Sequence, residues 1–223
     1  LIDNNQERLG KNLWTDSLEG ELITLYQAYD EQDEARFIAG IVKTWMEGGE
    51  LYQDVGIVYR SNAQSRALEE ALLRINIPYR IYGGLRFYER MEIKNAMSYL
   101  KVIFNPHDNP AFERSIANPT RGIGVKSQAK IRDAAKTSNL SYIKAAAKLL
   151  DEEKMGGKAG QGLKTYLTLI SESIGLLDTT PLSELMERII QNSGLYQHHK
   201  KEAGEKGKTR IENLQELVTA AKN

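Results

Sequence analysis

Residues 118–131 read NPTRGIGVKSQAKI, and this stretch decides how the helical part of the chain is interpreted. Its proline predicts the end of a preceding helix, because the residue before a proline is disfavoured in the helical conformation. The two glycines around Ile123 predict a tight turn that lets a ligand approach the backbone closely. A new helix is expected from Val125, and the unpaired backbone N–H groups of its first turn would suit a phosphate.

Side chains of the phosphate-binding type stand beside this turn. Lys126 and Ser127 lie at the expected start of the helix, and Arg121 lies just ahead of it. The pattern Gly-Ile-Gly-x-Lys-Ser-x-Ala-x-Ile resembles the helix-hairpin-helix, a module that binds the DNA backbone without reading bases. The alternative is an ordinary glycine-rich corner between two helices, in which the isoleucine fills the core.

Charge is unevenly distributed along a chain whose formal net charge is zero. Residues 114–148 hold eight Lys and Arg and one acid, whereas residues 1–83 hold eight Lys and Arg and fourteen Asp and Glu. A local basic cluster favours nucleic acid, since neutralising phosphates releases counterions. A run of charge is more often only a solvated face, but here it coincides with the glycine turn.

The composition limits the class of protein. The chain has 223 residues, 41% hydrophobic residues and a mean hydropathy of −0.48, which predicts a soluble protein of one large or two small domains. We expect no membrane span and no signal peptide. The absence of cysteine excludes disulfides and thiolate metal sites and fits a reducing cytoplasm. The first residue is not Met, so we expect a fragment of a longer protein.

Residues 1–83 are predicted to contain part of a parallel α/β sheet. Residues 21–29, 55–59 and 79–82 are predicted to form strands, with helices between them. The uninterrupted apolar run at 55–59 indicates burial on both faces. Ligands of such sheets lie past the carboxyl ends of strands, where the chain places Arg60 and Asn62. These side chains and Ser61 between them either bind a phosphate or serve the fold, Ser61 or Asn62 as a helix cap and Arg60 in a surface ion pair.

Residues 84–223 are predicted to be all-helical. Gly83 and Gly84 stand between the two parts and predict either a tight turn or a hinge. Glycines at 156, 157 and 160 are expected to interrupt the helices. The expected helices are residues 87–104, 111–117, 125 onward, 141–150, 163–176, 182–191 and 210–221.

Two patterns near the C-terminus imitate cofactor sites. His198 and His199 are adjacent, without the helical i, i+4 spacing of a metal pair and without an evident carboxylate partner, so no metal is expected. Residues 204–209 imitate a nucleotide-binding P-loop, but Glu202 stands where the first glycine is required. We therefore predict no cofactor for this chain.

Four stretches together resemble the superfamily 1A DNA helicases of the UvrD, Rep and PcrA type. They are VYRSNAQSRALEEALL (58–73), YRIYGGLRFYERMEIKNAMSYL (79–100), PTRGIG (119–124) and GEKGKTRIENLQELVTAA (204–221). The resemblance implies that residues 1–83 are the first part of the RecA-like motor subdomain 2A. It implies that residues 84–223 are most of the helical subdomain 2B.

The resemblance also implies a function, a fragment of an ATP-dependent 3′–5′ DNA helicase. Subdomain 2A would contact single-stranded DNA phosphates at Arg60 and Asn62, and 2B would swivel about Gly83 and Gly84. The implied contacts of 2B with duplex DNA lie in the turn, at Thr120, Arg121, Gly122, Ile123 and Gly124.

The full-length enzyme would use ATP and Mg²⁺ in the bacterial cytoplasm, with repair or replication proteins as possible partners. This chain lacks the P-loop and the acidic Mg²⁺ motif, so we expect no ATPase or unwinding activity from it alone. The alternative is a regulatory arm that docks a protein and binds little DNA.

Overall fold

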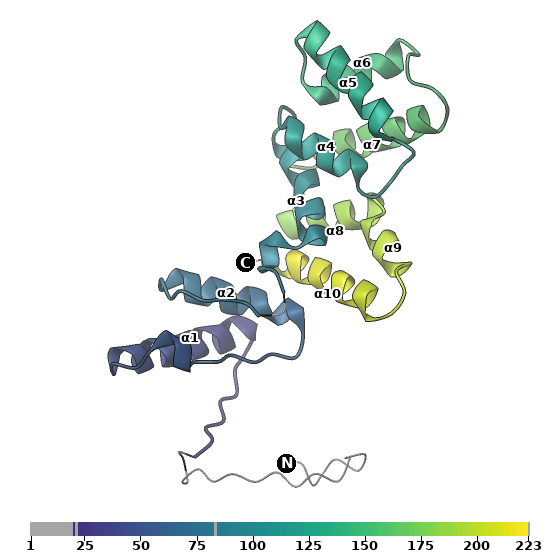
Figure 1. Cartoon of the computed structure of the whole chain (residues 1–223). Coiled ribbons are helices and arrows are strands. Elements are labelled where there is room, and N and C mark those ends of the chain that lie inside the picture. Colours follow the sequence, from purple (N-terminus) through teal and green to yellow (C-terminus); the bar gives the residue numbers. More distant parts are fainter. Residues whose placement is uncertain (1–19, 21, 83, 223) are drawn as a thin grey trace.

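The computed structural model describes residues 20, 22–82 and 84–222, and helices dominate this part of the chain (Figure 1). The helices are α1 (Glu31–Glu47), α2 (Ser65–Arg74), α3 (Met91–Phe104), α4 (Asn109–Ala117), α5 (Val125–Ser138), α6 (Tyr142–Asp151), α7 (Gly157–Gly175), α8 (Leu182–Asn192), α9 (Leu195–Lys200) and α10 (Glu205–Ala220). Short 3₁₀ turns are η2 (Tyr52–Asp54), η3 (Asn62–Gln64) and η4 (Phe87–Glu89).

The helices follow one another along an elongated molecule. The α1 and α2 helices pack together at one end, and α4 to α7 lie at the other (Figure 1). The α3 helix connects the two ends and packs against α4, α7, α8 and α10. The α10 helix also contacts η3, so the last helix of the chain lies beside its N-terminal part. No helix of the described residues is long and apolar enough to cross a lipid bilayer.

The two ends of α1 carry residues typical of helix ends. The Asp30 side chain accepts a hydrogen bond of 2.7 Å from the backbone N–H of Asp33, and Gly48 follows the last turn. Three acidic side chains in the first turn suit the positive end of the helix dipole. Two large apolar side chains of α1 face outward, since Ile41 and Trp45 are 50% and 44% exposed.

The parallel sheet predicted for residues 1–83 is absent from the part that the structure describes, which contains no strand. Residues 55–59 instead form an irregular connection in which burial alternates. Val55 and Ile57 pack on a small hydrophobic cluster, whereas Val58 is 96% exposed. This corrects the prediction of two-sided burial.

The physical reason is that a strand depends on backbone hydrogen bonds to a neighbouring strand, which an apolar run cannot supply by itself. Residues 22–25 illustrate the point. Leu22, Ile23 and Leu25 are each more than 90% exposed, despite their β-prone sequence.

Buried apolar residues of the described part form two clusters. The smaller comprises Ala39, Val42, Leu72 and Ile77. The larger extends from Phe87 to Leu217 and joins α3 through α10. The domain boundary at residues 83 and 84 remains a prediction, as does the hinge: Gly83 lies outside the described residues, and Gly84 is exposed in a bend.

Arg90 breaks the helix that was predicted over 87–104. Its backbone is extended (φ −63°, ψ 143°), and α3 begins only after it. Its guanidinium donates to the Asn62 carbonyl (2.8 Å), to Asn213 Oδ1 (2.8 Å) and to Ser65 Oγ (2.7 Å). Periodicity cannot show such a break, because the residues that cause it are distant in sequence.

Three other helices depart from the predictions. The α7 helix begins at Gly157 rather than 163, so Gly160 is helical instead of a break. A Cβ on Gly160 would lie 2.3 Å from the Met155 carbonyl oxygen, so glycine serves close packing there. The α9 helix lies between the helices predicted at 182–191 and 210–221, and α10 begins at Glu205 rather than at 210.

Candidate nucleic-acid interface

The glycine turn connects α4 to α5, and α5 begins at Val125 as predicted. The two helices do not pair with each other in the manner of a helix-hairpin-helix. The α5 helix packs chiefly against α6, and α4 chiefly against α3. The turn therefore lies where two helix pairs meet.

The inner side of the turn is occupied by Ile123 and Arg121. Ile123 is 6% exposed and belongs to the larger hydrophobic cluster. The Arg121 guanidinium donates four hydrogen bonds, to the carbonyls of Ser115 (3.3 Å), Pro119 (3.0 Å) and Ser193 (2.7 Å) and to the Tyr99 hydroxyl.

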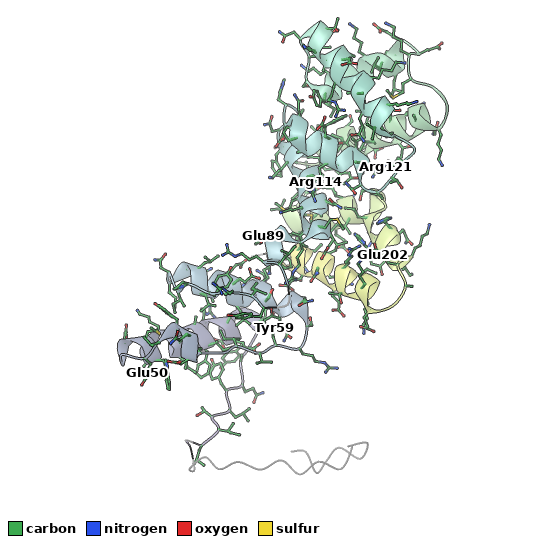
Figure 2. The ribbon with its side chains drawn as sticks, in the orientation of Figure 1. Glu50, Tyr59, Glu89, Arg114, Arg121 and Glu202 are labelled. Carbon is green, nitrogen blue, oxygen red and sulfur yellow. The ribbon has the colours of Figure 1, made fainter. Side chains whose placement is uncertain are left out.

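These contacts give Arg121 a structural task. Ser115 lies in the last turn of α4 and Ser193 directly follows α8, so the guanidinium satisfies carbonyls at the ends of two helices. Figure 2 shows Arg121 between α4 and the region of α8 and α9. Arg121 was predicted to contact DNA, but the N–H donors of its guanidinium point into the protein.

Two tyrosines complete the environment of Arg121. The guanidinium carbon lies 5.6 Å from the centre of the Tyr99 ring and 5.7 Å from that of Tyr166. Burial raises the pKa of Tyr99 to about 12, an effect that the nearby guanidinium opposes. The Tyr99 hydroxyl donates to the Asn118 carbonyl at 2.6 Å, which fixes the start of the turn.

The outer side of the turn faces solvent. Thr120, Gly122, Gly124 and Lys126 are exposed, and Ser127 is partly buried. In the described structure no side chain caps the start of α5, and its first turn holds no acidic residue. The backbone N–H groups of residues 125–127 therefore lack helical partners at a basic and accessible helix end, which favours an anion.

Lys158 belongs to this surface, although the sequence analysis did not single it out. Gly122 has a φ of +79°, and a Cβ there would lie 2.7 Å from Lys158 Cγ. A Cβ on Gly162 would lie 2.1 Å from the Arg121 carbonyl oxygen. The glycines of GGKAGQG (156–162) were the available signal, but those at 156, 157 and 160 were interpreted as helix breaks.

The basic cluster around the turn is only partly available to a ligand. Arg132 pairs with Glu113 at 2.7 Å, and Arg114 donates to Asn95 Oδ1 at 2.9 Å. Lys126 and Lys158, by contrast, are exposed and form no ion pair with any described residue. Lys126 lies in the first turn of α5 and the Lys158 stem lies against Gly122, so both are cations beside the turn without an ion pair in the chain's described part.

Arg60 and Asn62 lie elsewhere. Figure 2 places their neighbour Tyr59 at the α1–α2 end of the molecule, away from Arg121. The Arg60 side chain is exposed without an ion pair to a described residue, so the predicted alternative of a surface ion pair is not seen. Gln64 Oε1 accepts from the N–H groups of Arg60 (3.1 Å) and Ser61 (3.0 Å) and so supports the helix start itself.

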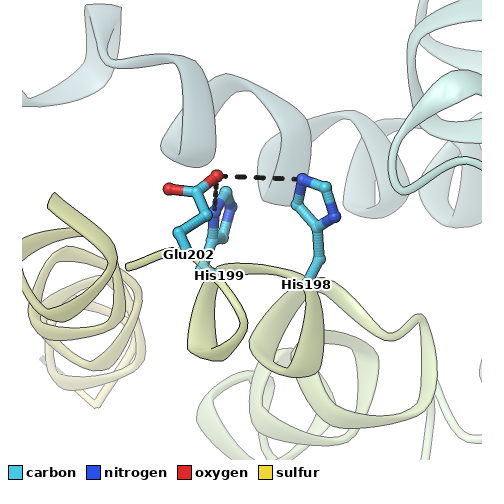
Figure 3. Close-up of side chains that lie close together, drawn as sticks. All are labelled: His198, His199 and Glu202. Atoms are coloured by element: carbon cyan, nitrogen blue, oxygen red, sulfur yellow. Dashed lines mark hydrogen bonds and ion pairs between the residues drawn. The ribbon is translucent and has the colours of Figure 1, made fainter. Parts of the chain in front are cut away.

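The adjacent histidines do have a carboxylate partner, contrary to the sequence analysis. Glu202 Oε1 lies 3.3 Å from His199 Nδ1 and 3.9 Å from His198 Nε2 (Figure 3). Arg210 Nη1 lies 2.5 and 2.8 Å from the two oxygens of Glu202, so a guanidinium already neutralises this carboxylate. The cluster is an ion-paired junction between α9 and α10. Burial lowers the pKa of His199.

Comparison with known proteins agrees with the helicase resemblance. The chain is 49% identical over 222 residues to DNA helicase II of Escherichia coli (strain K12), 46% over 224 residues to DNA helicase II of Haemophilus influenzae and 36% over 223 residues to the ATP-dependent DNA helicase PcrA of Leuconostoc citreum. These alignments cover 100% of this chain but only 30 to 31% of each relative. The family profile described as the UvrD-like helicase C-terminal domain matches residues 1–223, and the chain therefore belongs to this family.

Proposed function

We propose that this chain is the part of an ATP-dependent 3′–5′ DNA helicase that holds duplex DNA by its backbone. The observation that carries the proposal is the uncapped start of α5, whose free N–H groups stand beside Lys126 on the exposed side of the turn. Such a site recognises phosphate rather than bases, so it would bind duplexes without sequence preference. The names of the relatives support DNA as the partner.

The whole protein would couple this contact to ATP hydrolysis with Mg²⁺. In our proposal residues 1–83 form part of the motor subdomain 2A, where Arg60 and Asn62 contact single-stranded DNA. Residues 84–223 form most of 2B, which swivels about Gly83 and Gly84 and meets repair or replication proteins. The chain itself would hydrolyse no ATP, because it has no P-loop to hold the phosphates.

Within the turn, the proposal divides the candidate residues by the side that they face. Thr120, Gly122, Gly124, Lys126 and Ser127 offer donors to phosphate, while Ile123 and Arg121 hold the turn in place. Arg121 would therefore act on DNA binding through the shape of the turn, since four of its N–H groups already have protein acceptors.

Duplex binding against salt tests the proposal. Fluorescence anisotropy with two short duplexes of unrelated sequence should give equal affinities that fall steeply as salt rises. Lys126→Ala should weaken binding to both alike, whereas Lys94→Ala, an exposed lysine on α3, should not. Binding that is insensitive to salt, or that both lysine variants affect equally, would rule out the proposed contact.

A second candidate function is a regulatory arm that docks another protein. It is favoured by α1, whose outer face exposes Ile41 and Trp45 along a hollow that Phe37 also lines. Apolar faces of this kind mark protein contacts. A pull-down that survives nuclease treatment, together with no duplex binding, would support this function over the first.

A further inference from the structure

Lys158 is held against the turn by a reciprocal pair of glycine contacts. The stem of Lys158 runs along Gly122, where a Cβ would lie 2.7, 3.1 and 3.4 Å from Cγ, Cδ and Cε. In the other direction, Gly162 of α7 lies under the Arg121 carbonyl. Side chains at either glycine would separate α7 from the turn, so both glycines serve this contact.

This arrangement changes the meaning of the first glycine in the Gly-Ile-Gly pattern. A glycine in a DNA-binding turn is expected to admit the ligand's backbone. Here the space over Gly122 is filled by the aliphatic stem of Lys158, and the ammonium group continues beyond it. Lysine commonly lays its stem along a surface and keeps the charged end in water.

The position of the stem brings a second free cation to the start of α5. Gly122 is two residues from Gly124, the residue that precedes α5, so at most about 7.6 Å of backbone separates them. Lys158 is exposed and pairs with no acidic side chain among the residues described. Each strand of a duplex carries a phosphate about every 3.4 Å along the axis, so a strand that passes the start of α5 offers neighbouring phosphates to a second cation.

We propose that Lys158 is a second phosphate contact of the duplex interface and that Gly122 is a glycine in order to seat it. This inference rests on the proposed function, because it assigns a further residue to the same surface. The ligand is the sugar–phosphate backbone of duplex DNA. The interface then spans the turn, the first turn of α5 and the first turn of α7.

The test compares Lys158→Met with Lys126→Ala in duplex binding over a range of salt. Methionine keeps an apolar stem over Gly122 and removes the charge. Loss of one phosphate contact should make the slope of log affinity against log salt about 0.9 less steep. Lys158→Met should show this change, Lys158→Arg should keep the wild-type slope, and Lys164→Met, an exposed lysine further along α7, should also keep it.

The outcomes separate the inference from the proposal beneath it. If Lys126→Ala loses affinity while Lys158→Met keeps the wild-type slope, the role of Lys158 is refuted and the duplex interface stands. If the wild-type chain binds no duplex, the interface fails and the role of Lys158 fails with it. Equal thermal melting of Lys158→Met and wild type shows that lost charge, rather than lost folding, causes the change.

Discussion

Arg121 is a basic residue in the candidate binding turn, yet its hydrogen-bond donors are already bound to acceptors within the protein. Its guanidinium satisfies carbonyls at the ends of α4 and α8 and lies over two tyrosine rings. A sequence pattern cannot separate this from a phosphate contact, because both require an arginine beside a glycine turn. The acceptors decide the matter, and they come from residues up to 72 positions away.

Arg121→Ala should therefore reduce stability more than it reduces any direct contact with DNA. Hydrogen bonds to charged groups are worth about 1.5–3 kcal/mol each and are not additive, so we expect a loss of about 2–4 kcal/mol in the free energy of unfolding. Urea denaturation measures it, with Lys126→Ala as the exposed control at less than about 0.5 kcal/mol. Equal stability of the two variants would contradict the structural role.

His199 should make the stability depend on pH in the acidic range. Burial lowers its pKa in the folded state, so the neutral form is favoured there, and the neighbouring groups are Glu202, His198 and Arg210. The unfolded chain takes up the proton first, near a pKa of about 6.5. The stabilising contribution is thus present above that pH and is lost as pH falls through the lowered folded value.

The experiment measures unfolding free energy against pH for two adjacent substitutions. His199→Gln should flatten the decline below about pH 6.5. His198→Gln is the matched control, because His198 is 48% exposed where His199 is 2% exposed, and it should leave most of the decline in place. If only His198→Gln removed the decline, His198 rather than His199 would be its source, and the prediction would be contradicted.

At the scale of elements, the contact between α7 and the turn depends on Gly162. A Cβ at this position would lie 2.1 Å from a backbone oxygen, which cannot move aside as a flexible side chain would. Gly162→Ala should destabilise the chain by at least about 2 kcal/mol, in the range of overpacked cores. Thermal denaturation measures the effect.

Gly175→Ala provides the control on the same helix. Nothing lies within 4 Å of its Cβ position, and alanine there should leave stability equal or slightly higher. If alanine lowers stability at Gly162 but not at Gly175, the loss comes from the close contact with the turn and not from the helix propensity of alanine. Equal effects would mean that α7 does not depend on the close approach.

The helices with strong local signals could be predicted from the sequence. The α5 helix begins at Val125, directly after the Gly-Ile-Gly pattern, as predicted. The helices that were misjudged depend on distant partners. The extended Arg90, which interrupts one predicted helix, binds Asn62 and Asn213, and Gly160 lies inside another helix at a point where the Met155 carbonyl leaves no room for a Cβ.

The candidate site could be predicted only where local sequence determines its structure. The exposed glycine turn and the start of α5 follow from local sequence. The inward orientation of Arg121 and the position of Lys158 beside Gly122 follow from tertiary packing, which the order of residues does not reveal. The strands at residues 21–29, 55–59 and 79–82 were predicted wrongly in the described part, since apolar runs do not supply the partner strands.

At the scale of the whole molecule, two hydrophobic clusters are joined by a polar contact. Arg90 donates to Ser65 Oγ at the start of α2 at 2.7 Å and to Asn213 Oδ1 of α10 at 2.8 Å, and Asn213 in turn donates to Glu92 Oε1 at 2.6 Å. Arg66 of α2, which is 1% exposed, donates a hydrogen bond of 2.5 Å to Glu216 of α10. The C-terminal helix thereby holds the α1–α2 pair to the helical part.

Asn213→Ala should loosen this connection and separate the unfolding of the two clusters. Leaving buried polar groups unpaired costs about 1–3 kcal/mol for each group. Calorimetry should show a broader or split transition for this variant, with Gln215→Ala, exposed on the same helix, melting as the wild type does. A single unshifted transition for Asn213→Ala would mean that apolar contacts alone join the two parts.

The central claim is that the backbone N–H groups at the start of α5 meet the phosphates of duplex DNA, and amide hydrogen exchange measures this most directly. Adding a short duplex should slow exchange at residues 125–127 and leave residues 205–207 unchanged, although α10 also begins without a side-chain cap. Unchanged exchange at residues 125–127 while the duplex is bound, or equal slowing at both helix ends, would contradict the claim.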